Sequence, residues 1–428
     1  MIVAIDDTDS RAGGCTTYLA SLIVQQFRES VVGYPLLVRL NPTIPHKTRG
    51  NGAVAIRFKT DLPDEVCAEI RDFVINTVSR LSHTDDENTN PGVIFLDENG
   101  GHEGYGDIIA NFPMRAVQDV IEIREVKTII KALGIDSFHL KNGRGLIGAL
   151  AASAFCLYGV PDATFELLLY RVQEKWGTPR FVDKDSMIAA HRAFYPLIWD
   201  TYDEVNDILV GVPRSADPVL FGIRGDDVDA INRASDLVVH EPELGRQMFV
   251  TNQGTDAHLI HVDGIADVQD FHSYVVSGRV SREPVTIEGG HVIFGITDDV
   301  GESLDCAAFE PTKEFRHTVR KLAAGDVVTV CGSVKSETLN IEKMHVDKTA
   351  AVFESGNPVC PLCGKRMKSA GVGQGYRCRK CRTKKMETTA GEGESGRVEV
   401  ERDIGEGWYE VPPCARRHLA KPLVREEY

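Results

Sequence analysis

The chain has 428 residues, of which 42% are apolar and 39 are glycine, and its formal net charge is −15. This length predicts three or four domains, and the composition excludes a disordered or fibrous protein. No apolar run is long enough to cross a bilayer, and the N-terminus lacks the features of a signal peptide, so we expect a cytoplasmic protein with no membrane partner.

The first segment, residues 1–125, alternates short apolar runs with amphipathic runs of helical period. Strands are expected at 2–5, 35–40, 53–58 and 92–96, and helices at 17–27 and 63–80. This alternation predicts an α/β layered domain.

Three carboxylates follow the first expected strand: Asp6, Asp7 and Asp9. Charges at the end of a buried strand repel one another unless a cation lies among them, so they indicate a Mg²⁺ site for phosphoryl transfer. Asp7 and Asp9 should point the same way, and Asp6 to the other face unless the strand has already ended. Alternatively, the acidic residues form a turn and Ser10 caps the helix.

Three glycine-rich or polar loops could bind phosphate. Backbone N–H groups at Gly13–Gly14 can approach an anion at the start of the next helix. Residues 141–148 have the outline of a phosphate-binding turn without the Lys-Ser/Thr ending of a Walker A loop, and a simple turn between helices is the alternative. Residues 41–52 suit phosphate or ribose, or form a solvated hairpin. We expect phosphate contacts from Gly14, Lys47, Lys141, Gly143 and Arg144.

The second segment, residues 126–258, mixes helices and strands. A turn at 142–145 opens a helix, strands are expected at 164–170, 207–212 and 247–251, and a helix is expected at 226–238. This order is compatible with a ferredoxin-like sandwich.

Residues 265–350 contain five strand-like runs with a single helix between the third and fourth. The strands are expected at 274–280, 291–296, 303–309, 327–334 and 338–344, and the helix at 312–322. This is the order of an OB-fold barrel, and an undifferentiated small β-barrel is the alternative. The whole chain is therefore expected to be a multidomain protein of the α/β and α+β classes.

The last segment, residues 355–428, contains two CxxC pairs, formed by Cys360, Cys363, Cys378 and Cys381. Four thiolates at this spacing close a tetrahedral shell around a structural Zn²⁺, whereas a redox dithiol is the weaker interpretation. The other six cysteines are scattered singly, which suits a reducing compartment.

The same segment is strongly basic: residues 357–385 hold nine Lys or Arg and no acidic residue. A basic zinc ribbon beside an OB-fold is typical of RNA binding, although a solvated charged face is the alternative. The expected RNA contacts are Lys365, Arg366, Arg379, Lys380 and Arg382.

Several long motifs make the chain resemble the archaeal TiaS family of tRNA-agmatidine synthetases. They are IDDTDS at 5–10, GGCTTYLA at 13–20, LNPTIPHKTRGNGAV at 40–54, HLKNGRGLIGALAA at 139–152, FGIRG at 221–225 and YEVPPCARRHLAKPL at 409–423. The resemblance implies a kinase-like N-terminal domain and an ATP-dependent ligase. Such an enzyme phosphorylates the C2 oxygen of the wobble cytidine in the isoleucine tRNA with anticodon CAU, and agmatine then displaces the phosphate.

The resemblance also implies roles for individual residues. Asp6, Asp7 and Asp9 would be the metal and phosphoryl-transfer carboxylates, and Thr16 would be autophosphorylated, although the residues alone make Thr16 only a good N-cap. For agmatine, a planar guanidinium needs oxygen acceptors, and we expect them around Phe221, Gly222, Arg224 and Asp226, where the acidic residues could instead charge a helix start.

The motifs leave two alternative functions. An adenylating lysidine-type synthetase would need an SGGxDS loop, which the sequence lacks. A non-catalytic single-strand-binding protein built on the OB-fold and zinc ribbon would leave the first 258 residues unexplained. ATP turnover with tRNA and agmatine separates enzyme from binder.

Overall fold

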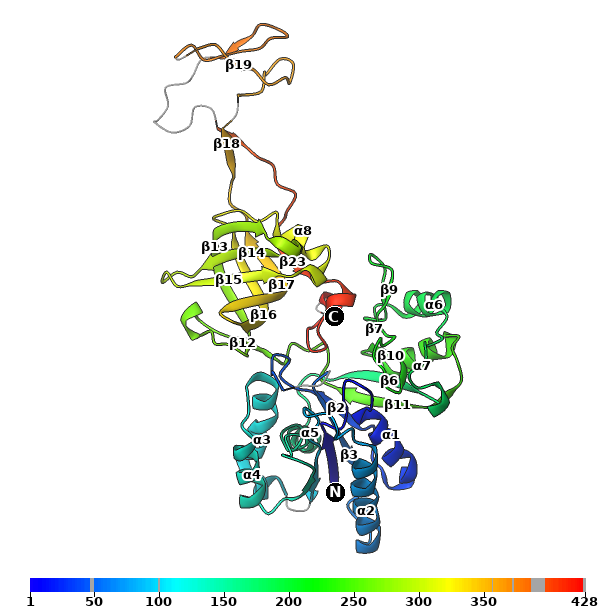
Figure 1. Ribbon diagram of the computed structural model, residues 1–428. Helices are drawn as coiled ribbons and strands as arrows, with labels where there is room; N and C mark the ends of the chain where they lie inside the picture. Colours follow the sequence, from blue (N-terminus) through cyan, green and yellow to red (C-terminus); the bar gives the residue numbers. More distant parts are fainter. Residues whose placement is uncertain (47–49, 99–100, 356, 372, 386–396, 426–428) are drawn as a thin grey trace.

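The computed structural model describes residues 1–46, 50–98, 101–355, 357–371, 373–385 and 397–425. A helix-flanked sheet is followed by a β-barrel, and a small cysteine-bearing module lies beyond the barrel at the far end of the molecule (Figure 1). Within the described residues, no helix is both long and apolar enough to span a membrane.

The first 258 residues share one nine-stranded sheet, in the order β5-β4-β1-β3-β2-β11-β6-β10-β7. Its strands are β1 (Ile2–Asp6), β2 (Leu36–Arg39), β3 (Gly52–Arg57), β4 (Gly92–Leu96), β5 (Asp136–His139), β6 (Thr164–Arg171), β7 (Ile198–Trp199), β10 (Val219–Gly225) and β11 (Glu243–Thr251). The pairs are antiparallel except β2 with β11, which run parallel and join the two halves of the sheet.

Helices cover both faces of this sheet (Figure 1). They are α1 (Thr16–Gln26), α2 (Asp64–Leu81), α3 (Gly101–Gln118), α4 (Ile123–Ala132), α5 (Leu146–Tyr158), α6 (Lys184–Phe194) and α7 (Val228–Leu237). β1 is buried throughout, because its side chains alternate between two cores. Ile2 and Ala4 pack with α3, α4 and α5, whereas Val3 and Ile5 pack with α1 and α2.

The expected elements at 2–5, 35–40, 53–58 and 92–96 are confirmed as β1 to β4, and the two expected helices as α1 and α2. The expectation for residues 126–258 is partly wrong. The run at 207–212 forms only β9 (Ile208–Leu209), which pairs with β8 (Tyr202–Asp203) outside the main sheet. The sheet strand is instead β10, and α7 then begins where Asp227 accepts a hydrogen bond from the N–H of Ala230.

The barrel is closed by five strands with the expected order. They are β13 (Ser273–Thr286), β14 (Val292–Thr297), β15 (Ser303–Ala308), β16 (Val327–Lys335) and β17 (Thr338–Lys348). β13 pairs with both β14 and β16, and β15 pairs parallel with β17. The helix between the third and fourth strands is α8 (Phe315–Val319), shorter than the expected 312–322 because a 3₁₀ turn precedes it. β12 (Leu259–His261) and β23 (Gly407–Glu410) extend the barrel sheet.

A two-stranded stalk connects the barrel to the cysteine-bearing module (Figure 1). The stalk pairs β18 (Phe353–Ser355) with β22 (Arg397–Glu399), and the module contains β19 (Lys368–Ser369), β20 (Tyr376–Arg377) and β21 (Lys384–Lys385). After the stalk, β23 returns to the barrel and the chain continues toward the first sheet.

Candidate active site

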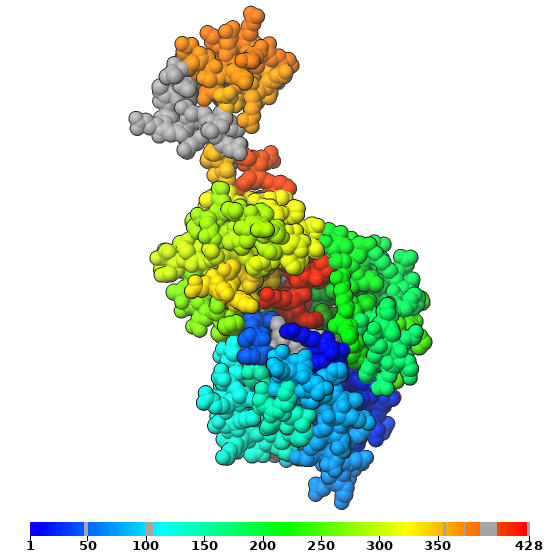
Figure 2. Space-filling view, in the orientation of Figure 1, coloured from blue at the N-terminus to red at the C-terminus, as the bar shows by residue number. Residues whose placement is uncertain are grey.

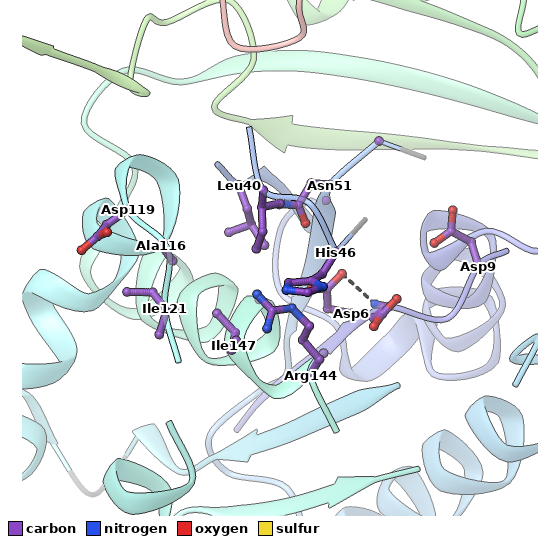
Figure 3. Close-up of a pocket in the computed structure, with 16 residues that line it drawn as sticks. Asp6, Asp9, Leu40, His46, Asn51, Ala116, Asp119, Ile121, Arg144 and Ile147 are labelled. Atoms are coloured by element: carbon purple, nitrogen blue, oxygen red, sulfur yellow. Dashed lines mark hydrogen bonds between the residues drawn. The ribbon is translucent and has the colours of Figure 1, made fainter. Parts of the chain in front are cut away.

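Asp6, Asp7 and Asp9 line one cavity at the end of β1, which we term the carboxylate cavity. Figure 3 shows Asp6, His46 and Arg144 close together in it, with Asp9 to one side. β1 ends at Asp6, and Asp7 adopts a left-handed φ of 60°. This turn ends the strand alternation, so Asp6 faces the same cavity as its two neighbours.

The carboxylate cavity concentrates negative charge. Burial raises the pKa of Asp6 well above its usual range, and the charge on Asp7 raises it further. Burial also raises the pKa of Asp7 to about 7, although the backbone N–H of Asn90 donates a hydrogen bond to Asp7 Oδ2 at 3.0 Å. Burial and charge repulsion disfavour the ionised forms of Asp6 and Asp7, and a hard divalent cation bound by their oxygens would remove that repulsion.

The N-terminus of α5 packs directly against Asp6. A side chain at Gly148 would overlap Asp6 Oδ2, and a Cβ at Gly145 would lie 2.5 Å from the backbone oxygen of Asp6. Only glycine allows this approach, which brings the positive end of α5 to the carboxylates. Arg144 lies just before the helix, and its buried Nη2 has no hydrogen-bond partner within the described part of the chain. This side of the cavity is therefore suited to an anion.

Residues 83–90, after α2, hold in place the loop that carries Asp7 and Asp9. The backbone N–H of His83 donates to the Thr8 oxygen at 3.2 Å, and Thr89 Oγ1 donates to the Asp9 oxygen at 2.6 Å. His83 Nδ1 lies 3.2 Å from Ser10 Oγ, so Ser10 is bound to this segment and does not cap α1. Sequence reasoning missed the segment because its contacts are 73–83 residues away in the chain.

The five residues expected to contact phosphate are dispersed. Arg144 lines the carboxylate cavity. Gly14 forms a left-handed turn with φ of 77° against the His83 ring, and Gly143 forms another with φ of 74° against His139. Lys141 Nζ donates to the backbone oxygens of Thr84 (3.2 Å) and Asp86 (2.7 Å), so the residue ties two loops together. Lys47 lies outside the described residues.

Thr16 is the first residue of α1. The N-cap is Cys15, which makes no side-chain capping bond, so the N-cap interpretation of Thr16 is wrong. The Thr16 hydroxyl is buried and lies 3.0 Å from Thr8 Oγ1. Thr16 and Asp9 both line a second cavity, which we term the Glu166 cavity.

The Glu166 cavity adjoins the carboxylate cavity, and both are lined by Asp9, Gly50 and Gly52. Arg224 Nε donates to Glu166 Oε1 at 2.8 Å, and Arg39 lies 3.8 Å from the other oxygen. Burial alone would raise the pKa of Glu166, but these two guanidinium groups hold it below its usual value. Its other lining residues include Asp200 and Asp217.

The four residues expected to bind agmatine separate into two pairs. Gly222 and Arg224 line the Glu166 cavity. Phe221 is fully buried in the core beneath α6 and α7, because successive strand residues face opposite sides. Asp226 accepts hydrogen bonds from Trp199 Nε1 (2.9 Å) and Arg425 Nε (2.8 Å), away from this cavity.

Sequence reasoning missed most of the Glu166 cavity. Glu166 could have been noticed, because it interrupts an otherwise apolar strand at 164–170 and a buried charge needs partners. Asp200, Asp217 and Arg39 carry no local signal, since only the sheet order brings their strands and loops together.

The four expected metal ligands converge in the C-terminal module. One ligand atom from each of Cys360, Cys363, Cys378 and Cys381 lies within 4.8 Å of all the others. The Cys360–Cys381 and Cys363–Cys378 sulfur distances are 3.3 and 3.4 Å. Sulfurs around a tetrahedral Zn²⁺ at about 2.3 Å are about 3.8 Å apart, so the residues fit that ion.

The five residues expected to bind RNA, Lys365, Arg366, Arg379, Lys380 and Arg382, are all exposed on this module. Tyr376 is partly buried against the cysteine cluster. The basic side chains therefore form a solvent-facing surface around a small metal-binding core.

Fold and sites together define a class: multidomain α/β proteins with a glycine-walled acidic cleft, a five-stranded barrel and a basic zinc ribbon. Family models agree. The TiaS TCKD domain matches residues 2–142, the TiaS FLD domain 143–258 and the TiaS C-terminal zinc ribbon domain 357–404.

Curated relatives and solved structures extend this agreement to the whole chain. The tRNA(Ile2) 2-agmatinylcytidine synthetase TiaS of Methanosarcina mazei is 51% identical over 100% of this chain and 98% of its own length. The Archaeoglobus fulgidus protein of the same name is 46% identical over 99% and 97%. A crystal structure of a TiaS–tRNA(Ile2)–AMPCPP–agmatine complex is 42% identical with a TM-score of 0.82, covering 99% of this chain and 96% of that one. The chain belongs to the TiaS family.

Proposed function

We propose that this protein is an ATP-dependent ligase that joins agmatine to C2 of the wobble cytidine of the CAU-anticodon isoleucine tRNA, forming agmatidine. The observation that carries the proposal is the pair of adjoining cavities that share Asp9, in a chain that matches an agmatine-bound and tRNA-bound relative over 99% of its length. One cavity would take phosphate and a cation, and the next would take a positively charged amine.

The carboxylate cavity would bind ATP and carry out a kinase-like step on the C2 oxygen. Asp6, Asp7 and Asp9 would hold Mg²⁺, which would neutralise the triphosphate when bound. Arg144 and the N-terminus of α5, which lie beside Asp6, would contact the transferring phosphoryl group. Gly14, Lys141 and Gly143 would shape the surrounding loops, and Lys47 would add a cation.

Thr16 would be the autophosphorylated residue. Thr16 lines the Glu166 cavity together with Asp9, and Asp9 also lines the carboxylate cavity. The hydrogen bond to Thr8 Oγ1 orients the hydroxyl.

The Glu166 cavity would bind agmatine. Agmatine carries a guanidinium at one end and a primary amine at the other. The carboxylates Asp200 and Asp217, which already pair with Arg416 and Arg180, would accept from the guanidinium with their remaining lone pairs. Gly222 leaves room in the wall, and Arg224 fixes Glu166. Phe221 and Asp226 would support this wall from behind, through the core and through Trp199.

The remaining domains would bind the tRNA. We assign residues 1–125 to the kinase-like domain, 126–258 to a ferredoxin-like domain, 265–350 to an OB-fold, and 355–428 to the zinc ribbon and tail. Zn²⁺ held by Cys360, Cys363, Cys378 and Cys381 would maintain the basic surface that meets RNA phosphates.

The test incubates the purified protein with ATP, Mg²⁺, agmatine and the isoleucine tRNA transcript, and analyses the tRNA nucleosides by mass spectrometry. Agmatidine should form at the wobble position only when all components are present. A transcript with anticodon UAU is the control and should stay unmodified. Product formation without ATP, or ATP-dependent modification at another nucleotide, would contradict the proposal.

A further inference from the structure

The C-terminal tail, residues 411–425, lies between the barrel and the sheet domains. Figure 2 shows the tail filling the space between them. The resemblance singles out the sequence YEVPPCARRHLAKPL at 409–423, yet none of the roles proposed above uses it. Its position raises the question of what this segment contributes to the site.

Buried interactions on both sides fix the tail around residue 418. Arg416 forms ion pairs with Asp200 and with Glu410 at 2.6 Å, and both the Arg416 and Asp200 side chains are 4% exposed. On the other side, Leu419 is 2% exposed and belongs to the core beneath α5. Removing either anchor would leave a buried charge or a cavity, so the tail is an integral part of the fold.

Backbone hydrogen bonds then set the position of His418 itself. The N–H of Gly254 donates to the His418 oxygen at 2.8 Å, and the N–H groups of Thr255 and Asp256 donate to the Leu419 oxygen at 3.1 and 2.8 Å. His418 is thus the exposed residue between an ion-paired arginine and a core leucine. Its main chain is held rigidly while its imidazole remains accessible.

The His418 imidazole faces the junction of the two cavities. It lines the Glu166 cavity together with Asp9 and Thr16. Its Nε2 would lie 3.7 Å from a Cβ placed on Gly50, and Gly50 lines both cavities. A titratable base is therefore present where the amine bound in one cavity would meet the carbon activated in the other.

We propose that His418 is the general base for the aminolysis step, an inference that rests on the two-step reaction proposed above. The neutral imidazole takes a proton from the bound ammonium and frees the nitrogen lone pair. The nitrogen forms a bond to C2, the C2–O bond breaks, and its electron pair leaves with the phosphate. The second proton on nitrogen passes to water.

The experiment measures both half-reactions in full-length His418→Gln with tRNA present. Transfer of the labelled γ-phosphate of ATP to tRNA should stay within about twofold of wild type, while agmatine incorporation falls by about 100-fold or more. Hydroxylamine is already unprotonated at neutral pH, so its incorporation should fall much less than that of agmatine. If the wild-type protein incorporated agmatine without transferring γ-phosphate to tRNA, the two-step reaction would be refuted, and with it the general-base role that rests on it.

His261→Gln is the matched control, because His261 is an exposed histidine on β12 that lines neither cavity. This variant should leave the rates of phosphate transfer, agmatine incorporation and hydroxylamine incorporation unchanged. Equal losses with agmatine and hydroxylamine would show that His418 only positions the site, and would overturn the proposal. So would unchanged agmatine incorporation, or a loss explained by weaker tRNA binding. In His418→Ala, added imidazole should restore agmatine incorporation in part.

Discussion

The carboxylate cavity and the zinc ribbon are organised by different forces. The cavity is held by packing: α5 lies against Asp6 through glycine contacts, and residues 83–90 bind the loop from the other side. The ribbon has a buried core of only Cys360, Met367 and Cys378 among the described residues. A core this small cannot stabilise a fold without metal. The carboxylate cavity is therefore held by a rigid scaffold, whereas the basic surface lies on a small module that depends on its own metal site.

Among the variants considered, Asp7→Asn should reduce the activity of the carboxylate cavity the most. The change preserves size and the acceptor for the Asn90 N–H, but it removes a charge that would bind the metal. Agmatidine formation and Thr16 phosphorylation should fall together by about two orders of magnitude or more, while tRNA affinity stays nearly constant. Kinetic and filter-binding assays measure the two effects. If this variant kept full activity while a substitution far from β1 abolished phosphoryl transfer, the active site would lie elsewhere.

Cys378→Ser should disrupt the zinc ribbon and leave the carboxylate cavity intact. The purified protein should carry about one zinc, and the variant should lose both the zinc and most of its tRNA affinity. Metal analysis and tRNA binding are the measurements, with Cys67→Ser as a control because Cys67 lies outside the cluster. Retained zinc in Cys378→Ser would refute the four-cysteine assignment.

Gly148→Ala should test the close packing of α5 against Asp6. The added methyl group would displace either the helix or the carboxylate, at a cost of about 1–3 kcal/mol in unfolding free energy. Activity should fall further than stability alone explains. Gly245→Ala is the control, because a Cβ there meets no atom within 4 Å. Denaturant unfolding and agmatidine formation measure the two effects, and wild-type behaviour of Gly148→Ala would mean that α5 does not fix Asp6.

Neutralising Arg379, Lys380 and Arg382 should have the smallest effect on chemistry. Each lost phosphate contact should flatten the log–log salt dependence of tRNA binding by roughly one unit, with ATP binding unchanged. Binding measured across a salt series gives the slope. An unchanged slope would identify the basic surface as solvated only.

The parts of the site that sequence predicts are those whose residues are neighbours in the chain. The DDTD run, the glycine turns and the paired CxxC motifs each carry their chemistry within a few residues, so their pattern is enough. The contacts of Lys141 cannot be predicted in this way. Its hydrogen bonds to the turn at Thr84 and Asp86 depend on how β4 and β5 pair. The Glu166 cavity needs the parallel pairing of β2 with β11, which no local pattern reveals.

The fold follows the same rule. The barrel strands alternate clearly, and the sequence predicts them in order. It does not predict β10, because the two glycines in FGIRG weaken the strand pattern. In the structure Gly222 and Gly225 permit close approach: a Cβ at Gly222 would lie 2.8 Å from Leu168, and one at Gly225 would overlap the backbone of Leu197. Glycines in a strand therefore mark tight packing beside the site.

Phosphorylation of the wobble cytidine can be followed by labelling its C2 oxygen with ¹⁸O. If the carboxylate cavity transfers phosphate to that oxygen and the amine then displaces it, the label should appear in inorganic phosphate during one turnover. The measurement is mass spectrometry of the released phosphate and of AMP, which would carry the label if the C2 oxygen were adenylated instead of phosphorylated. Label in AMP, or unlabelled phosphate alongside complete agmatidine formation, would contradict the account.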